Sequence, residues 1–166
     1  MRVASIMIFV VICFVGTQAF CGVNDPDSGA YVYEKIQTVD MKKAEIISLL
    51  TAYIAEKFVS AKSVIQLRDS GLGKIVGDVI LWSKDAGFFD AFQGIKARLV
   101  IDSKDGKYRI QFMNIHGVNS RGMTTAFSEF EGANRYRIEP MAKTIMDDFS
   151  NELQTYLEKT KTTSNW

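Results

Sequence analysis

The chain has 166 residues, of which 47% are hydrophobic and 23% are charged, with 20 Lys and Arg against 19 Asp and Glu. This length suits one domain with a core of its own. The composition excludes a disordered chain, a collagen-like rod and a strongly basic nucleic-acid binder.

Residues 1–21 have the three-part layout of a secretory signal peptide. Arg2 supplies a positive charge, residues 6–15 form an unbroken apolar run, and Thr17 and Ala19 are the small residues that a cleavage site requires. The run is shorter than the ~20 apolar residues of a membrane-spanning helix, so we expect no stable membrane span after cleavage. The pattern predicts a periplasmic or secreted protein.

Cleavage after Ala19 and cleavage after Cys21 both remain open. A lipid anchor on Cys21 is disfavoured, because Phe20 stands where the residue before the lipidated cysteine should be small, and Gln18 stands where a branched aliphatic residue is usual. Cys13 leaves with the signal segment, so the exported chain keeps one cysteine or none. It can form neither an internal disulfide nor a zinc site of paired cysteines.

A short polar linker is predicted at residues 22–29, followed by a single domain over residues 30–160. Loose alternation over residues 31–39 predicts a strand. Asp40 can cap a helix, and apolar residues at spacings of three and four over residues 41–59 are typical of an amphipathic helix.

Alternating apolar residues then predict four strands, at residues 61–68, 74–82, 91–102 and 107–118. A turn over residues 103–106 contains Asp-Gly, the strongest short signal of a hairpin. The inward-facing residues of these strands should be Ile75, Val79, Leu81, Ile95, Ala97, Leu99, Ile101, Tyr108, Ile110 and Phe112.

Residues 119–138 lack a clean period and are predicted to form a long loop. Glu139 and Pro140 then open a second helix, because proline suits the first helical turn, and residues 161–166 should fray. The predicted order is β-α-β-β-β-β-α, an α+β fold in which both helices cover one face of an antiparallel sheet. Because the first strand continues into a helix, it need not lie beside the second strand in the sheet.

Three segments resemble a bacterial family of exported domains of unknown function, described as having a TATA-binding-protein-like fold. They are AEIISLLTAYIAEKFVSAKSVIQLRD, GKIVGDVIL and IKARLVIDSKDGKYRIQFMNI. The KDGKYR turn inside the third segment is the most specific part, and the resemblance extends over about residues 30–118. It implies the same fold and an export signal. It transfers no catalytic residue, because the family has no established activity and fold does not imply function.

The sequence offers few residues for catalysis. His116 is the only histidine, and nothing places a second catalytic group beside it, so a structural or surface imidazole is favoured. The sequence contains no G-x-S-x-G, Walker, dinucleotide or H-E-x-x-H motif. The glycines of residues 71–77 precede a strand, whereas a phosphate loop opens a helix. We predict no catalytic residue, no metal and no cofactor.

The sheet face opposite the helices is the first candidate binding surface. Strand alternation selects six residues for it: Arg68, Asp78, Lys96, Arg98, Arg109 and Gln111. Gln66 is an alternative to Arg68. Such a face would carry excess positive charge and suit an anionic or peptide partner. The alternative is an ordinary solvated face with cross-strand ion pairs.

The loops are the second candidate surface, because long loops often carry function and because aromatic residues and arginine favour interfaces. The candidate contacts are Phe88, Phe89, Arg121, Phe127, Phe130, Arg135 and Arg137. Their rings could instead pack beneath the loops and hold them to the sheet.

Export and the missing catalytic motifs favour a non-catalytic binding or envelope-associated module whose partner is an envelope protein or a peptide. A hydrolase-like enzyme with a site in residues 119–138 is the alternative. Nucleic-acid binding is suggested only by the name of the fold, and balanced charge and export oppose it.

Overall fold

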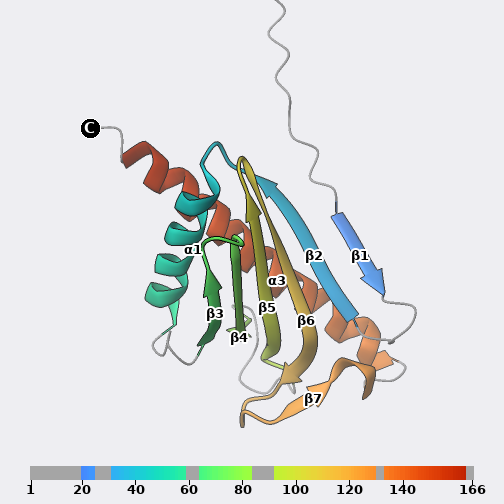
Figure 1. Cartoon of the computed structure of the whole chain (residues 1–166). Coiled ribbons are helices and arrows are strands. Elements are labelled where there is room, and N and C mark those ends of the chain that lie inside the picture. Colours follow the sequence, from blue (N-terminus) through green and yellow to red (C-terminus); the bar gives the residue numbers. More distant parts are fainter. Residues whose placement is uncertain (1–19, 25–30, 59–63, 84–91, 130–132, 164–166) are drawn as a thin grey trace, which may run out of the picture.

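The structure is a computed structural model that describes residues 20–24, 31–58, 64–83, 92–129 and 133–163. The strands in these ranges are β1 (Phe20–Asn24), β2 (Tyr31–Thr38), β3 (Ile65–Asp69), β4 (Lys74–Trp82), β5 (Gly94–Lys104), β6 (Lys107–Val118) and β7 (Thr124–Ala126). The helices are α1 (Lys43–Lys57), the short 3-10 helix η1 (Phe127–Glu129) and α3 (Ala133–Thr163). Figure 1 shows α3 crossing the sheet obliquely beside α1.

All strands belong to one antiparallel sheet with the order β1-β2-β6-β5-β4-β3, and β7 adds to β6. β2 therefore lies far from β3, its neighbour in the sequence, as the helical connection between them allows. β2 and β7 share one edge of β6, at residues 107–112 and 116–118 respectively. The α+β class and the placement of both helices against one sheet face are confirmed.

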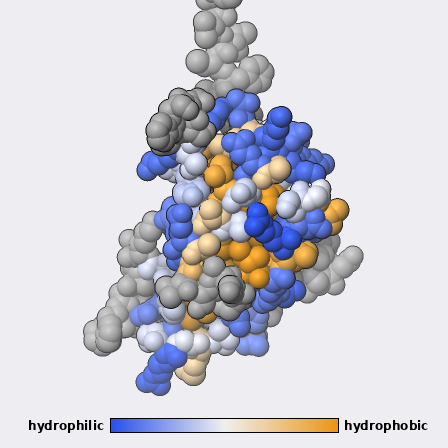
Figure 2. All heavy atoms as spheres, turned by 60° about the vertical axis from the view of Figure 1, so that its left-hand side comes forward, coloured by the Kyte–Doolittle hydropathy of each residue, from blue (hydrophilic) through white to orange (hydrophobic). Residues whose placement is uncertain are grey.

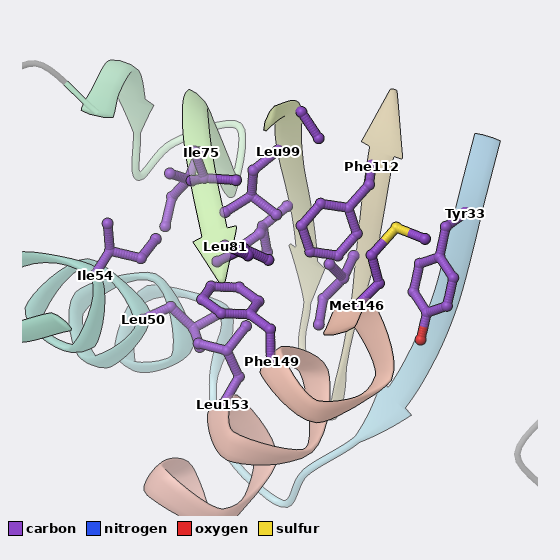
Figure 3. Packing of buried hydrophobic residues seen from close by; sticks show 14 of the residues in the cluster. Tyr33, Leu50, Ile54, Ile75, Leu81, Leu99, Phe112, Met146, Phe149 and Leu153 are labelled. Carbon is purple, nitrogen blue, oxygen red and sulfur yellow. The ribbon is translucent and has the colours of Figure 1, made fainter. Parts of the chain in front are cut away.

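The core lies between this sheet face and the two helices, and every residue predicted to face inward on β4, β5 and β6 is buried. The helices contribute apolar residues at spacings of three and four, including Leu50 and Ile54 from α1 and Phe149 and Leu153 from α3. Figure 3 shows these side chains meeting those of the strands. The ring of Phe112 lies edge-on to Phe149, with centroids 5.9 Å apart, an arrangement that adds about 1 kcal/mol to the burial of the rings.

The prediction of a long loop at residues 119–138 is wrong. This segment contains β7, η1 and the first turns of α3, so Pro140 lies inside a helix and not in its first turn. A proline there removes one backbone hydrogen bond and costs about 3 kcal/mol. The turns that follow bury residues such as Met146 and Leu153 against the sheet. This packing stabilises the helix and outweighs the unfavourable helix propensity of the proline.

The N-terminal segment also differs from expectation. Residues 22–24, predicted to belong to a linker, continue β1, which pairs antiparallel with β2 from Phe20 opposite Lys35 to Asn24 opposite Tyr31. At the other end of the chain, α3 continues to Thr163, past the start of the predicted frayed tail. Residues 1–19 of the predicted signal peptide lie outside the described residues. In the described part of the chain, no helix is long and apolar enough to cross a membrane.

Candidate binding surface on the outer sheet face

The outer face is the sheet face turned away from α1 and α3. Strand alternation directs to it the residues between the buried positions, and along β4 these are Lys74, Val76, Asp78, Ile80 and Trp82. Ile80 and Trp82 are 43% and 55% exposed. The outer face therefore combines polar and large apolar side chains.

A β-bulge in β6 decides which side chains reach the outer face. The register between β5 and β6 shifts between two pairs, Lys96 with His116 and Arg98 with Met113. Asn114 is the extra residue, and its φ of 50° lies in the left-handed region that asparagine tolerates better than most residues. Phe112 and Ile115 are both buried although they are three positions apart. The bulge thus turns His116 outward, beside Lys96.

A hollow of about 240 Å³ lies next to this bulge. Its polar lining consists of Asp78, Lys96, Arg98, Asn114, His116 and Thr124. Three of the residues proposed from the sequence therefore come together there. Asn114, His116 and Thr124 were not among the proposed binding residues, although the break in alternation between Phe112 and Ile115 is a signal that could have indicated the bulge.

The charges of Arg98 and Asp78 compensate each other. Arg98 Nε donates to Asp78 Oδ1 at 3.2 Å, and Gln66 Nε2 donates to Asp78 Oδ2 at 2.6 Å. Arg98 Nη2 also donates to Gln66 Oε1 at 3.2 Å, so that each of these three side chains is hydrogen-bonded to the other two. Both oxygens of Asp78 are therefore engaged, and the hollow gains little negative charge from it.

Unlike Arg98, Lys96 and His116 are not paired with an acidic side chain in the described part of the chain. Lys96 is exposed and His116 is half-buried. Within the described residues, neither side chain has a hydrogen bond or an ion pair. Because they lie directly opposite each other on β5 and β6, their Cβ atoms should be about 5 Å apart. This side of the hollow therefore offers donor groups and a positive charge that the described chain leaves uncompensated.

The other half of the outer face fits the alternative of a solvated surface with cross-strand ion pairs. Arg109 Nη2 donates to Asp102 Oδ2 at 2.8 Å, and its Nη1 lies 3.6 Å from Glu34 Oε2. Lys74 Nζ lies 3.5 Å from Asp102 Oδ1, and Gln111 Nε2 donates to Glu34 Oε2 at 2.7 Å. The hydrogen bond from Arg109 to Asp102 is the main reason why the pKa of Arg109 is raised. Arg109 and Gln111 are thus committed to neighbouring side chains.

Arg68 does not join the candidate surface. It lies opposite Ile75 on β4, whose side chain is buried among the core residues, and side chains of paired residues point to the same face of a sheet. A register shift in β3 between Ile65 and Leu67 brings Gln66 to Asp78 instead. Of the two residues considered for this position, Gln66 is the one on the outer face.

The residues proposed as loop contacts do not lie together on one surface. Phe127 is buried in η1, with its ring edge-on to Phe92 at 6.5 Å, so the alternative of a packed ring applies to it. Arg121 is exposed in the turn between β6 and β7, where its backbone N–H donates to Asn119 Oδ1. Arg135 and Arg137 belong to α3 and not to a loop. Phe88, Phe89 and Phe130, and the side chains of these two arginines, lie outside the described residues.

A second hollow, of about 380 Å³, lies where the ends of α1 and β4 meet α3. Its apolar lining is Phe58, Ile80, Leu81, Trp82, Ile145 and Phe149. In Figure 2, apolar side chains gather on the side of the molecule turned toward the viewer, with hydrophilic ones around them. At the rim, Lys57 pairs with Glu152, which also accepts a hydrogen bond from Tyr53 at 2.9 Å. Burial raises the pKa of Tyr53 to about 12, so its hydroxyl remains a donor.

The described residues contain no set of ligands of the kind that binds a metal ion. No three His, Cys, Asp or Glu side chains gather there closely enough to hold a metal ion. The described outer face presents hydrogen-bond donors, two arginines paired with acidic side chains and exposed apolar groups, and such a mixture of polar and apolar groups is typical of a recognition surface.

The comparison with known proteins concerns the fold. The sequence model of the domain of unknown function DUF4468 with TBP-like fold matches residues 33–117. A TBP-like protein from Parabacteroides distasonis ATCC 8503 has 13% identity and a TM-score of 0.60, with 79% of this chain and 94% of that chain covered. A DUF4468 family protein from Bacteroides ovatus ATCC 8483 has 16% identity and a TM-score of 0.55, with 79% and 85% covered.

No curated protein matches the sequence. The family match extends over the segment from β2 to the end of β6, which includes α1, the hairpin of β5 and β6, and the bulge at Asn114. The resemblance of this segment to a TATA-binding-protein-like domain is thereby confirmed, and the chain belongs to the DUF4468 family of domains of unknown function with a TBP-like fold.

Proposed function

We propose that the protein is an exported, non-catalytic binding module whose outer sheet face receives a peptide or a protein of the cell envelope. One observation carries the proposal: both helices pack on the inner face, and the open outer face contains a hollow in which Lys96 and His116 are uncommitted within the described chain. The same face exposes the ring of Trp82, and aromatic residues are enriched at interfaces.

The surroundings of His116 support binding over catalysis. A histidine that activates a nucleophile lies within hydrogen-bond reach of a hydroxyl or thiol and is itself oriented by a third group. In the described part of the chain, His116 has no such hydrogen bond. The hydrolase-like alternative placed its site in a loop at residues 119–138, and that segment contains β7, η1 and the start of α3.

The N-terminal layout supports export. Of the two cleavage positions, we favour the one after Ala19, because β1 begins at Phe20. Cleavage after Cys21 would remove the residues that lie opposite Lys35 and Glu34 of β2. The exact mass of the protein recovered from the periplasm or the medium tests this choice, and a full-length mass in the cytoplasm would contradict export itself.

Photo-crosslinking in living cells tests the binding function. A photoreactive amino acid at Ile80 on the outer face should capture an envelope protein or peptide. The same amino acid at Ser48, an exposed position on α1, is the matched control and should capture little. Equal capture at the two positions, or capture at Ser48 alone, would contradict the assignment of the outer face.

A further inference from the structure

We propose that the hollow beside the β6 bulge is a subsite for a side-chain carboxylate of an acidic peptide. This inference rests on the proposed binding function and names the chemistry that the outer face recognises. The residues that would hold the carboxylate are Lys96, Asn114, His116 and Thr124, all of which line the hollow.

The backbone brings these groups together from three strands. Lys96 comes from β5, and His116 lies opposite it on β6. Thr124 comes from β7, which pairs with the end of β6 so that Thr124 lies opposite Val118. Asn114 is the bulge residue itself. Because the sheet backbone sets these positions, the site needs no mobile loop to assemble it.

The charge balance selects an anion. Asp78 is the acidic side chain in the lining, and both of its oxygens accept hydrogen bonds from Arg98 and Gln66. Among the described residues, no acidic side chain forms an ion pair with Lys96, so its ammonium group is available to a ligand. A carboxylate can accept several hydrogen bonds at once, and bonds from a charged donor are about twice as strong as those between neutral groups.

The apolar neighbours select a peptide over a small free anion. Ile80 lies opposite Lys96 on the outer face, and Trp82 follows on the same strand opposite Gly94. A Cβ atom at Gly94 would overlap the backbone oxygen of Leu81 and would lie 3.1 Å from Trp82 Cε3, so the glycine lets both the β4 backbone and the indole ring approach β5 closely. Trp is one of the residue types that are enriched among binding hot spots. A fitting peptide therefore carries a large apolar residue next to its acidic one.

An NMR titration with two capped tetrapeptides tests the subsite. The probes are acetyl-Leu-Asp-Leu-Asp-amide and its isosteric counterpart acetyl-Leu-Asn-Leu-Asn-amide, added at millimolar concentration to the isotope-labelled processed protein. We expect the acidic peptide to shift the amide signals of Lys96, Asn114 and His116, and the neutral peptide to shift them far less. Equal shifts with both peptides, or no shift in either titration, would overturn the proposal.

Matched variants separate a specific subsite from general charge attraction. Lys96→Gln should weaken binding of the acidic peptide about tenfold, the loss expected for one charged hydrogen bond. Lys42→Gln removes the same charge at an exposed position before α1 and should leave the affinity unchanged. An equal loss in the two variants would overturn the proposal. Overlay of the free spectra shows whether each variant keeps the fold.

The same variants distinguish this inference from the proposed function. If crosslinking from Ile80 persists in the Lys96→Gln protein while the peptide titrations fail, the outer face still binds a partner and the carboxylate subsite is wrong. If neither measurement detects binding on the outer face, the proposed function fails as well.

Discussion

The hydroxyl group of Tyr33 on β2 donates a hydrogen bond of 2.7 Å to Asp147 Oδ1 on α3, although the two residues are far apart in the sequence. Lys35, only 7% exposed, donates from the next inward position of β2 to Asn151 at 2.9 Å. Gln37 follows and accepts from Tyr108 at 2.7 Å. The inner face of β2 is thus polar and bonded, and among the described residues no buried side-chain polar atom lacks a partner.

Replacement of Tyr33 by Phe should lower the free energy of unfolding by about 1–1.5 kcal/mol, because Asp147 loses a hydrogen-bond donor in a partly buried place. Urea unfolding measures this change. A double-mutant cycle with Asp147→Ala isolates the pair, because alanine has no acceptor for the Tyr33 hydroxyl, and we expect a coupling of about 1 kcal/mol. Strictly additive effects of the two substitutions would contradict a direct interaction.

Asp147 should also contribute to acid sensitivity. Burial raises its pKa, but hydrogen bonds from Lys143 and Tyr33 and the charges of Lys143 and Lys35 outweigh burial, so the pKa is lowered overall. A lowered pKa in the folded state means that the stabilisation is present above the unfolded pKa of about 3.9 and is lost as the pH falls through the folded value.

The stability of the Asp147→Asn protein should therefore fall less steeply with acid than that of the unchanged protein. Urea unfolding at a series of acidic pH values measures the two slopes. Asp40→Asn is the control. Lys161 likewise lowers the pKa of Asp40 through a hydrogen bond and its charge. This pair is highly exposed and should matter less, because water and salt screen it. Parallel curves for the Asp147→Asn and unchanged proteins would contradict the prediction.

The bulge at Asn114 should tolerate glycine and reject a β-branched residue. Its φ of 50° costs most L-residues about 1–2 kcal/mol but costs glycine almost nothing. Thermal unfolding of Asn114→Gly should show little change, and Asn114→Val should lower the melting temperature. If the two variants unfold at the same temperature, the left-handed conformation is not a constraint at this position.

The ion pairs around Arg109 should contribute little to stability. Arg109→Gln removes the contacts with Asp102 and Glu34, but these groups are partly exposed, so we expect a loss of less than about 1 kcal/mol. The loss should shrink further in molar salt, because screening shortens the range of the attraction. Urea unfolding at low and high salt measures both effects, and a large loss independent of salt would contradict them.

Local periodicity was sufficient to predict several elements. The predicted strands at 74–82 and 107–118 coincide with β4 and β6, and the predicted helix at 41–59 contains α1. These elements alternate or repeat clearly because one side of each is buried in the core. The start of α3 could not be predicted from periodicity, because its first turns show no apolar period and contain Pro140.

The candidate surface was predicted in part. Alternation along single strands correctly placed Lys96, Arg98, Asp78, Arg109 and Gln111 on the outer face. It failed at Arg68 and left His116 unassigned, because register shifts in β3 and β6 change which residues face outward. A rule of strict alternation cannot include an extra residue in one strand.

The amino-acid sequence by itself determined the amphipathic elements, the α+β class and the family resemblance, because these properties depend on residues within one segment of the chain. Only the tertiary structure decided that β1 pairs with β2 and β7 with β6. It also decided the burial of Lys35 against α3 and the outward position of His116. Each of these depends on contacts between distant segments, and the free energy of such contacts comes from burial and hydrogen bonds that no single segment contains.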